Sequence, residues 1–358
     1  MSATKIIPDS DIIHRTAVSS SDEWTPGTVI RPLLTSDKPD KIEISNGLLQ
    51  KRAALSRKAL LSLVTASENL SRKEKVLQEK LEELGFLNPH QVDNRTLEGM
   101  HHWQQRNWME ALNSYLWSRR YNFVDHGTEY ASIQKETVQH YLDEGKLPTA
   151  EILTDNQQAL AEPAELPTEP IGKVMFRRAS TSRPPARPLQ QAHLSGILWH
   201  GLKRIRKYRD IDIVNNLRAA LKSSGSSLDI MFAAYNIEGL DCGIYCYDIA
   251  THTIKPKQKG DFRREMQDVL VGQPSPQTAS CTLLFVSEFE RYQWRYRHER
   301  ALRMLYMDTA KIAHQVLLVA TAYSLNTHIT PAVRDKITSQ FLGLDPVKQQ
   351  VLYTISLS

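Results

Sequence analysis

The amino-acid sequence predicts an α+β fold in which helices flank one mixed sheet. In the second half of the chain, short apolar runs of strand length alternate with amphipathic helical patterns, which places strands and helices around a common core. The composition, with 41% hydrophobic and 24% charged residues over 358 positions, is that of a globular chain. The length allows two domains, or one large domain with an appended segment.

Residues 1–100 are expected to form a mostly helical segment with a partly disordered start. The opening residues are polar and are interrupted by Pro8, Pro26, Pro32 and Pro39. Leucines over residues 48–64 recur at near-helical spacing. Ser71 and Glu74 then form a capping-box pattern, and Gly85 occupies a C-cap position, so we expect a helical hairpin here.

Residues 101–358 are expected to form the main domain. The stretch at 101–123 predicts a helix whose aromatic side chains pack rather than bind a ligand. Residues 148–172 are rich in Pro, Ala, Glu and Gln without an apolar period, which is typical of a linker or a long surface connection.

Strands and helices then alternate to the end of the chain. After a helix in the sequence PLQQAHLSGILWHGLKRI, apolar runs predict strands at residues 230–235, 244–247 and 282–286. The pattern over residues 299–323 predicts a long helix with apolar side chains on one wide stripe. The sequence VLYTISL predicts a closing strand.

The charge distribution limits the possible partners. Residues 171–209 contain ten Lys or Arg and no Asp or Glu. This basic block is not interleaved with stacking aromatics and matches no reading motif, so we expect no nucleic-acid binding. A phosphate-bearing cofactor or an acidic peptide fits better.

Other classes are excluded by what the sequence lacks. No apolar run approaches the ~18 residues that span a bilayer, and the first residues lack the basic-then-apolar order of a signal peptide. We therefore expect a cytoplasmic protein that does not associate with a membrane. Cys242, Cys246 and Cys281 lack zinc-ligand spacing, and we expect no metal site. Dinucleotide, P-loop and nucleophile-elbow motifs are also absent.

One loop carries groups suited to a phosphate. In RRASTSRPPARP, Arg178 and Arg183 flank Ser180 ahead of a helix, and such side chains can hold a phosphate by charge-assisted hydrogen bonds. A solvated basic loop is the alternative reading of the same residues.

The order of these features resembles the SagB-type dehydrogenases of the nitroreductase superfamily, which are FMN enzymes known as azoline oxidases. The resemblance is most specific in NIEGLDCGIYCYDIATH, residues 236–252, and covers about residues 103–358. RALR at 300–303 and the closing FLGLDPVKQQVLYTISL also resemble the family. The resemblance implies a nitroreductase-like fold, FMN as cofactor and a homodimer with the helix at 299–323 in or near the interface.

The resemblance also assigns roles. It places the FMN phosphate at Arg178, Ser180 and Arg183, and it brings Ser224 and Gly225 to the isoalloxazine. The family's active-site Lys-Tyr pair has its nearest counterpart in Arg295 and Tyr296, the catalytic candidates.

Three departures from the family pattern bear on activity. The segment KSSGSSLD lacks the family's proline, and the second arginine of the phosphate loop falls at 183 instead of 182. Arg295 replaces the lysine, and a guanidinium is a poor proton shuttle because it stays protonated. Tyr296, with Arg295 and Arg297 on either side, can still move a proton if their charge favours its phenolate.

Two functional hypotheses follow. The first is an FMN-dependent oxidoreductase in natural-product maturation, acting on a peptide or carrier-bound intermediate, as in azoline-to-azole dehydrogenation. The second is a flavin-free pseudo-enzyme that serves as a scaffold or peptide-binding subunit of a biosynthetic complex. Both allow further partner proteins.

Overall fold

The structure is a computed structural model, and it describes residues 24–32, 40–65, 71–87, 92–119, 127–148, 156–181, 183–185, 187–209, 217 and 227–358. Contacts divide the chain into two compact units, residues 1–123 and 124–358. The expected disordered start falls mostly on residues outside the described ones. The sequence predicts a domain boundary between residues 100 and 101. This boundary stays a prediction, and its position falls inside the helix α3 (Asn94–Gln105).

The first unit contains a small sheet that leucine spacing alone does not predict. Three antiparallel strands follow one another in the order β1-β2-β3, with bounds β1 (Thr28–Pro32), β2 (Lys41–Asn46) and β3 (Lys51–Ser56). The expected helix over residues 48–64 therefore begins only at Arg57, with α1 (Arg57–Thr65). The reason is pairing: Ile44 of β2 lies opposite Ala53 of β3 and is fully buried.

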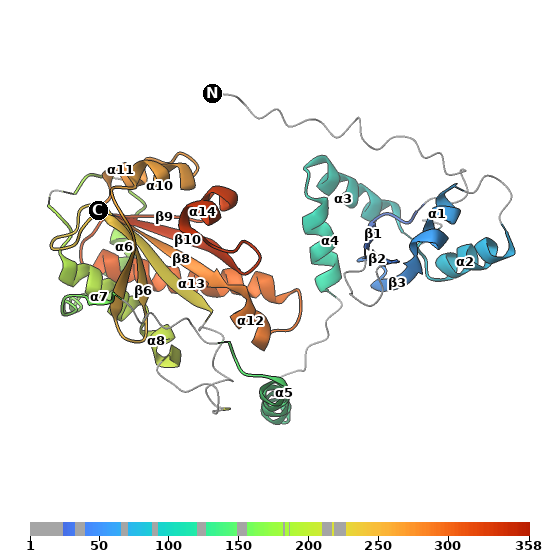
Figure 1. Cartoon of the computed structure of the whole chain (residues 1–358), viewed down its shortest axis with the longest axis horizontal. Helices are drawn as coiled ribbons and strands as arrows, with labels where there is room; N and C mark the ends of the chain where they lie inside the picture. Colours follow the sequence, from blue (N-terminus) through green and yellow to red (C-terminus); the bar gives the residue numbers. More distant parts are fainter. Residues whose placement is uncertain are drawn as a thin grey trace. The chain divides into compact units, whose positions relative to one another are not determined.

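Helices cover this sheet (Figure 1). In α2 (Arg72–Glu83) the capping box of Ser71 and Glu74 is present, and Gly85 has φ +80 just after the last turn, so both cap predictions are confirmed. The helix expected over residues 101–123 is wrong as one element. It is two helices, α3 and α4 (Met109–Ser118), because Asn107 turns the backbone to φ +57 between them.

The second unit is built on a seven-stranded sheet, and the α+β class is confirmed. The strand order is β4-β7-β6-β5-β8-β10-β9, and the paired strands run antiparallel. The expected strands are all present. Their bounds are β4 (Gln158–Ala159), β5 (Leu228–Ala234), β6 (Gly243–Asp248), β7 (Thr253–Lys259), β8 (Cys281–Glu288), β9 (Thr327–Thr330) and β10 (Gln349–Leu357).

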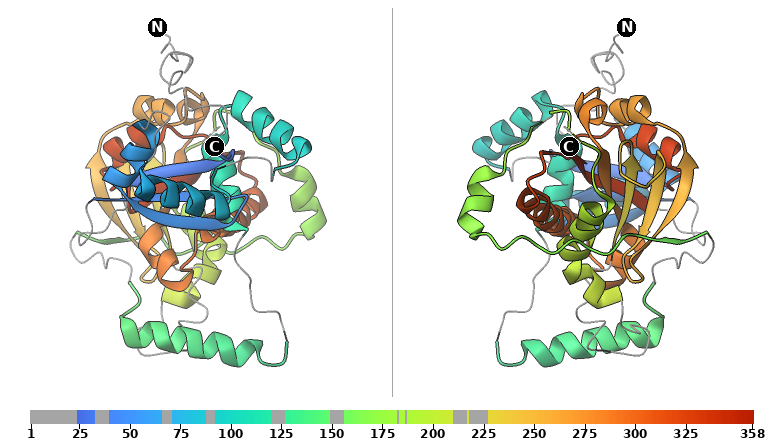
Figure 2. Two further views of the ribbon diagram at one scale, coloured as in Figure 1. Left: turned by 90° about the vertical axis from the view of Figure 1, so that its right-hand side faces the viewer. Right: turned by 90° about the vertical axis from the view of Figure 1, so that its left-hand side faces the viewer.

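Helices pack on both faces of this sheet. One face carries α7 and α13 over a large apolar core, and the other carries α10 and α14 over a smaller one. Both views in Figure 2 show α5 at the periphery of the unit. The bounds are α5 (Tyr130–Glu144), α6 (Ile171–Arg177), α7 (Gln191–Gly201), α8 (Lys203–Arg209), α10 (Arg263–Val269), α11 (Ser275–Thr278), α12 (Phe289–Arg295), α13 (Ala301–Ala322) and α14 (Asp335–Leu342).

Glycines allow α7 and α13 to approach closely. A Cβ on Gly201 would lie 2.9 Å from the side chain of Val316, and one on Gly196 would lie 2.4 Å from the hydroxyl of Tyr323. The expected linker, residues 148–172, contacts α7, because the amide of Ala164 donates to the carbonyl of Ala192 at 3.0 Å. None of the helices in the described ranges is long and apolar enough to cross a membrane.

The segment at 236–248 turns into the sheet at two glycines. Gly239 has φ +73 in the turn ahead of β6. Gly243 begins β6, where a Cβ would lie 2.5 Å from the carbonyl oxygen of Gln258 on β7. Only glycine lets these two strands pair at this point.

Candidate functional site

The basic loop extends the sheet beyond its edge strand. After α6 ends, the amide of Thr181 donates to the carbonyl of Thr327 at 2.8 Å, and Ser180 forms a parallel bridge with Thr327 on β9. The hydroxyl of Thr327 donates in turn to the carbonyl of Ala179 at 3.4 Å. These bonds fix the backbone of the loop along β9.

The arginines of this loop differ in what they contact. Arg177 is occupied: it donates to both carboxylate oxygens of Glu169, at 2.7 Å each, and to the carbonyl of Thr321 at 2.8 Å. Arg178 is half-buried, and Ser180 and Arg183 are exposed. The side chains of these three form no hydrogen bond or ion pair with any other residue that the structure describes.

The donor set of the loop fits a phosphate. Two guanidiniums and one hydroxyl offer hydrogens to such a group, and bonds to β9 hold the backbone at residues 179–181. Ser224 and Gly225, which the resemblance assigns to the isoalloxazine, lie outside the described residues. The ring part of the expected site therefore stays a prediction.

Arg295 and Tyr296 lie at the end of α12, far from this loop. Arg295 is buried, and its guanidinium lies 5.5 Å from the ring centre of Tyr296. The ring of Tyr296 also packs against Tyr292 at 4.9 Å. Arg297 turns to α5 instead, where it binds Glu144 and lies 3.7 Å over the ring of Tyr141.

A carboxylate network holds α12 against the sheet. Asp229 of β5 accepts hydrogen bonds from Arg291 of α12 and, at 2.7 Å, from Arg209 of α8. Burial opposes the charge of Asp229, but the two guanidiniums outweigh it and hold the pKa of this carboxyl below its ordinary value. On the same helix Tyr292 donates to Asp308 at 2.9 Å, and burial together with Asp308 raises the pKa of Tyr292.

The two predicted parts of the site stand at opposite ends of α13, as Figure 1 shows for α6 and α12. Arg177, next to the phosphate loop, contacts Thr321 near the end of the helix, whereas Tyr296 packs with Leu305 near its start. The rise along the helix from Leu305 to Thr321 is roughly 24 Å. One chain does not bring the two parts together.

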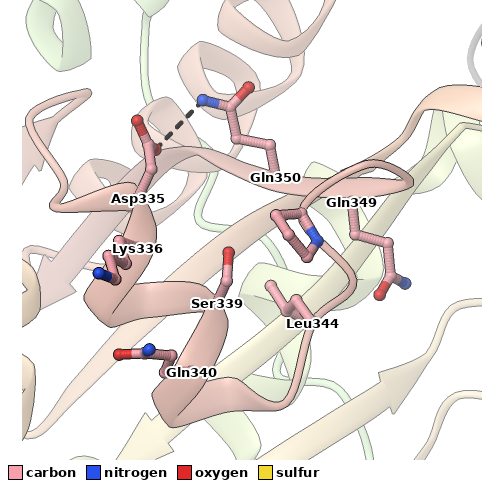
Figure 3. Close-up of a pocket in the computed structure, with 8 residues that line it drawn as sticks. Asp335, Lys336, Ser339, Gln340, Leu344, Gln349 and Gln350 are labelled. Atoms are coloured by element: carbon pink, nitrogen blue, oxygen red, sulfur yellow. Dashed lines mark hydrogen bonds between the residues drawn. The ribbon is translucent and has the colours of Figure 1, made fainter.

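A pocket lies between α14 and the start of β10. It has a volume of about 570 Å³, and Figure 3 shows its polar side chains. They are Asp335, Lys336, Ser339, Gln340, Gln349 and Gln350. The amide of Gln350 donates to Asp335 at 3.1 Å across one end of the pocket.

A second, smaller pocket adjoins the first. Its volume is about 250 Å³, and it shares Asp335 and Gln350 with its neighbour. Tyr353 lines it and also belongs to the cluster around Tyr296. Tyr306 lines it as well, and burial together with Asp335 raises the pKa of its hydroxyl. The strand β10 bulges here, between Val351 and Tyr353.

Sequence reasoning did not find these pocket residues. The closing segment FLGLDPVKQQVLYTISL resembles the family, but the resemblance assigns no site role to the glutamines in it. Their grouping depends on α14 folding back onto β10, for which the sequence gives no local signal. Among the described residues, no group of His, Cys, Asp and Glu could hold a metal ion.

Comparison with known proteins identifies relatives of this chain. Residues 187–357 match the family model described as Nitroreductase family. The trifolitoxin operon protein TfxC of Rhizobium leguminosarum bv. trifolii is 27% identical over 274 residues, which covers 74% of this chain and 76% of TfxC. The trifolitoxin-processing protein TfxB of the same organism is 26% identical over 137 residues, 37% of each chain.

A solved structure also resembles the chain. It is the Escherichia coli microcin synthetase McbBCD complex with truncated pro-MccB17 bound, at a TM-score of 0.38 and 14% identity. The match covers 82% of this chain and 98% of the matched one.

Proposed function

We propose that the protein is an FMN-dependent oxidoreductase of peptide natural-product maturation, and the match of residues 187–357 to the nitroreductase family model supports this. Its substrate is a peptide or a carrier-bound intermediate, and its reaction is the dehydrogenation of an azoline to an azole. The similarity to TfxC over three quarters of both chains supports a role in making a peptide product. The observation that carries the cofactor assignment is the phosphate loop, residues 178–183, where the side chains of Arg178, Ser180 and Arg183 have no partner among the described residues.

Each group of the loop has a defined part in this proposal. Arg178 and Arg183 neutralise and hold the phosphate, and the hydroxyl of Ser180 donates a third hydrogen bond. When bound, FMN supplies the acceptor for a hydride. Ser224 and Gly225 are proposed to lie against its ring.

The chain's own chemistry at the substrate is proton transfer. Conversion of an azoline to an azole removes one hydride and one proton from the ring. We assign Tyr296 as the base whose deprotonated oxygen takes this proton, with the guanidinium of Arg295 5.5 Å from its ring centre. Arg297 contributes less than the sequence suggests, because Glu144 neutralises it.

The proposed enzyme is a homodimer. In one chain, the phosphate loop and Tyr296 lie at opposite ends of α13, so a two-fold related copy is the simplest way to bring them together. The start of α13 also exposes apolar side chains, with Leu302 at 46% and Met307 at 55% exposure. Residues 312–320 instead pack in the core of the same unit. Light scattering at micromolar concentration is expected to give twice the chain mass, and a monomer would contradict the dimer.

The alternative is a flavin-free scaffold or peptide-binding subunit of a biosynthetic complex. It is favoured by one observation: Arg295 is buried beside Tyr296 where the resembling family keeps a lysine. A guanidinium in this place can stabilise an anion but cannot relay a proton.

The colour and activity of the purified protein distinguish the two proposed functions. A yellow protein that releases FMN on heating, and that removes 2 Da from a thiazoline-containing peptide, supports the enzyme. A colourless protein that does not bind added FMN supports the scaffold.

A further inference from the structure

Among the residues that the structure describes, three arginines are buried. Arg206, Arg291 and Arg295 expose 7%, 4% and 8% of their surface. A guanidinium stays protonated in a protein, and a buried charge is strongly unfavourable unless hydrogen bonds and an opposite charge compensate for it. Each of the three side chains therefore needs acceptors around it.

Two of these arginines have such acceptors. Arg206 donates to three backbone carbonyls and to the hydroxyl of Tyr247. Arg291 donates to both carboxylate oxygens of Asp229. The burial of these two guanidiniums is thus explained by groups of the chain itself.

Arg295 differs from both. Its Nε is enclosed and has no hydrogen-bond partner, and its guanidinium forms no hydrogen bond or ion pair with any residue in the described ranges. The ring centre of Tyr296 lies 5.5 Å away, but a ring face attracts a cation without replacing the oxygen acceptors that the N–H groups need. The described part of the chain leaves this charge uncompensated.

The missing partner is a single negative charge. The neighbouring arginines in sequence are already neutralised, Arg291 by Asp229 and Arg297 by Glu144. What is left over at Arg295 is one positive charge on a planar fork of donors. A carboxylate matches it in charge and in shape, because its two oxygens can accept two parallel bonds from one guanidinium.

The place of Arg295 points to the substrate as the source of this carboxylate. Arg295 ends α12, and the next residue is Tyr296, to which we assign the substrate proton. The cluster around Tyr296 includes Tyr353, which lines the smaller of the two pockets. A group held by Arg295 therefore lies next to the residue that we assign to the chemistry.

We propose that Arg295 binds a carboxylate of the peptide substrate and selects sequences that carry an acidic residue beside the ring to be oxidised. The bound carboxylate supplies the charge and the acceptors that Arg295 lacks, and it positions the neighbouring ring at Tyr296. The inference deepens the proposed function and rests on it for the identity of the substrate. The binding of a carboxylate at Arg295 does not depend on that function.

The first test uses the full chain and sodium propionate as a simple carboxylate. Thermal unfolding is followed in propionate and in sodium chloride at equal ionic strength, with propionamide as the neutral analogue. We expect propionate at about 100 mM to raise Tm by roughly 2 °C or more over chloride, because a ligand of the folded state stabilises it. Propionamide is expected to give no rise.

Variants assign this response to one side chain. Arg295→Met removes the charge at similar volume, so its Tm in chloride should equal or exceed that of wild type, and propionate should add nothing. Arg295→Lys keeps the charge without the fork and should respond more weakly than wild type. Arg303→Met, which changes an exposed arginine of α13, is the control and should respond like wild type.

The response to propionate decides between the outcomes. If wild type gains nothing, or if Arg295→Met gains as much, Arg295 holds no carboxylate and only packs on Tyr296. A larger gain from sulfate that is lost in Arg295→Met would assign the site to a divalent oxyanion and would also overturn the inference. If Arg295→Met does not fold, the weaker response of Arg295→Lys carries the same decision.

The second test measures specificity with two thiazoline peptides, one with aspartate and one with asparagine on both sides of the ring. We expect the flavin-loaded wild type to prefer the aspartate peptide at least about tenfold in kcat/KM, chiefly through KM, and Arg295→Gln to lose the preference. Equal values in wild type would contradict the substrate assignment. A colourless protein that responds to propionate would keep the carboxylate site and remove the proposed enzyme, whereas an active flavoprotein without the response would do the reverse.

Discussion

The hydroxyl of Tyr247 lies 2.6 Å from Nδ1 of His252. Arg206 donates to the Tyr247 oxygen at 3.0 Å, and we assign the tyrosine as the donor to Nδ1, which places the hydrogen of the neutral imidazole on Nε2. In this tautomer Nε2 donates to the hydroxyl of Ser195 at 2.8 Å. This chain of hydrogen bonds ties α8, the β6–β7 hairpin and α7 together.

Removal of one hydroxyl should break this network. Tyr247→Phe leaves a guanidinium hydrogen of Arg206 and Nδ1 of His252 without their partner. We expect a loss of about 1 to 3 kcal/mol in the free energy of unfolding, measured in urea. Tyr245→Phe is the control on the same strand, because within the described residues its hydroxyl donates to the carbonyl of Asp241 alone, and it should cost about 1 kcal/mol. An equal loss in both variants would contradict a coupled network.

The network also predicts a dependence of stability on pH. Burial, and then the charge of Arg206, lower the pKa of His252 to about 4, whereas an unfolded histidine titrates near 6.5. The unfolded state then binds the proton first, so His252 stabilises the fold fully above about pH 6.5 and less and less as pH falls toward 4.

His252→Asn isolates this effect. Asparagine does not titrate and accepts the backbone φ of +58 at this position. His298 and His328, whose pKa values burial also lowers, remain in both proteins and contribute equally. We expect stability to fall less steeply between pH 6.5 and 4 in the variant, by urea unfolding at each pH. Parallel curves would show that His252 does not titrate as inferred.

The phosphate loop can be tested by flavin content. Arg178→Ala with Arg183→Ala should abolish FMN retention and leave the fold intact, because neither side chain has a described partner. Loss of a charge-assisted contact costs roughly 1.5–3 kcal/mol, or about one to two decades in affinity for each arginine. Lys203→Ala with Arg204→Ala removes the same charge from the exposed side of α8 and should keep FMN. Retention of FMN in both double variants would move the phosphate to another group.

Tyr296 can be tested by turnover at constant flavin content. Tyr296→Phe removes only the hydroxyl, so the packing against Tyr292 and Arg295 persists. Dehydrogenation of a thiazoline peptide, followed by mass, should slow by roughly two to four decades, the range for a general base. Tyr115→Phe, an exposed hydroxyl in the first unit, should be silent. Full activity in a flavin-loaded Phe variant would make Tyr296 a packing residue.

Much of the fold could be predicted because its signals are local. The Ser71 capping box needs only one turn of chain, and the strands over residues 230–235 and 282–286 are apolar runs that must be buried wherever they pair. The helices around Asn107 show the limit. Their aromatic pattern is continuous, and the break depends on one residue in the left-handed region.

The site divides in the same way. The residue types and their order were enough to propose that Arg178, Ser180 and Arg183 bind a phosphate. Arginine side chains next to a serine hydroxyl can donate several hydrogen bonds to a phosphate wherever the segment lies in the fold. Their attachment to β9 through Thr327 links positions 148 residues apart, as the bond from Thr327 to Ala179 shows. No local pattern contains such a contact.

The sequence by itself determined the α+β class, the main strands and the residue types that could serve a cofactor, because each depends on periodicity or on side-chain chemistry. Only the tertiary structure decided that Arg297 is neutralised by Glu144, that the phosphate loop and Tyr296 lie at opposite ends of α13, and that Arg295 is buried without a partner among the described residues. The physical reason is that these facts depend on which distant segments meet, and chain folding chooses those contacts by the burial of whole faces rather than by the identity of neighbours in sequence.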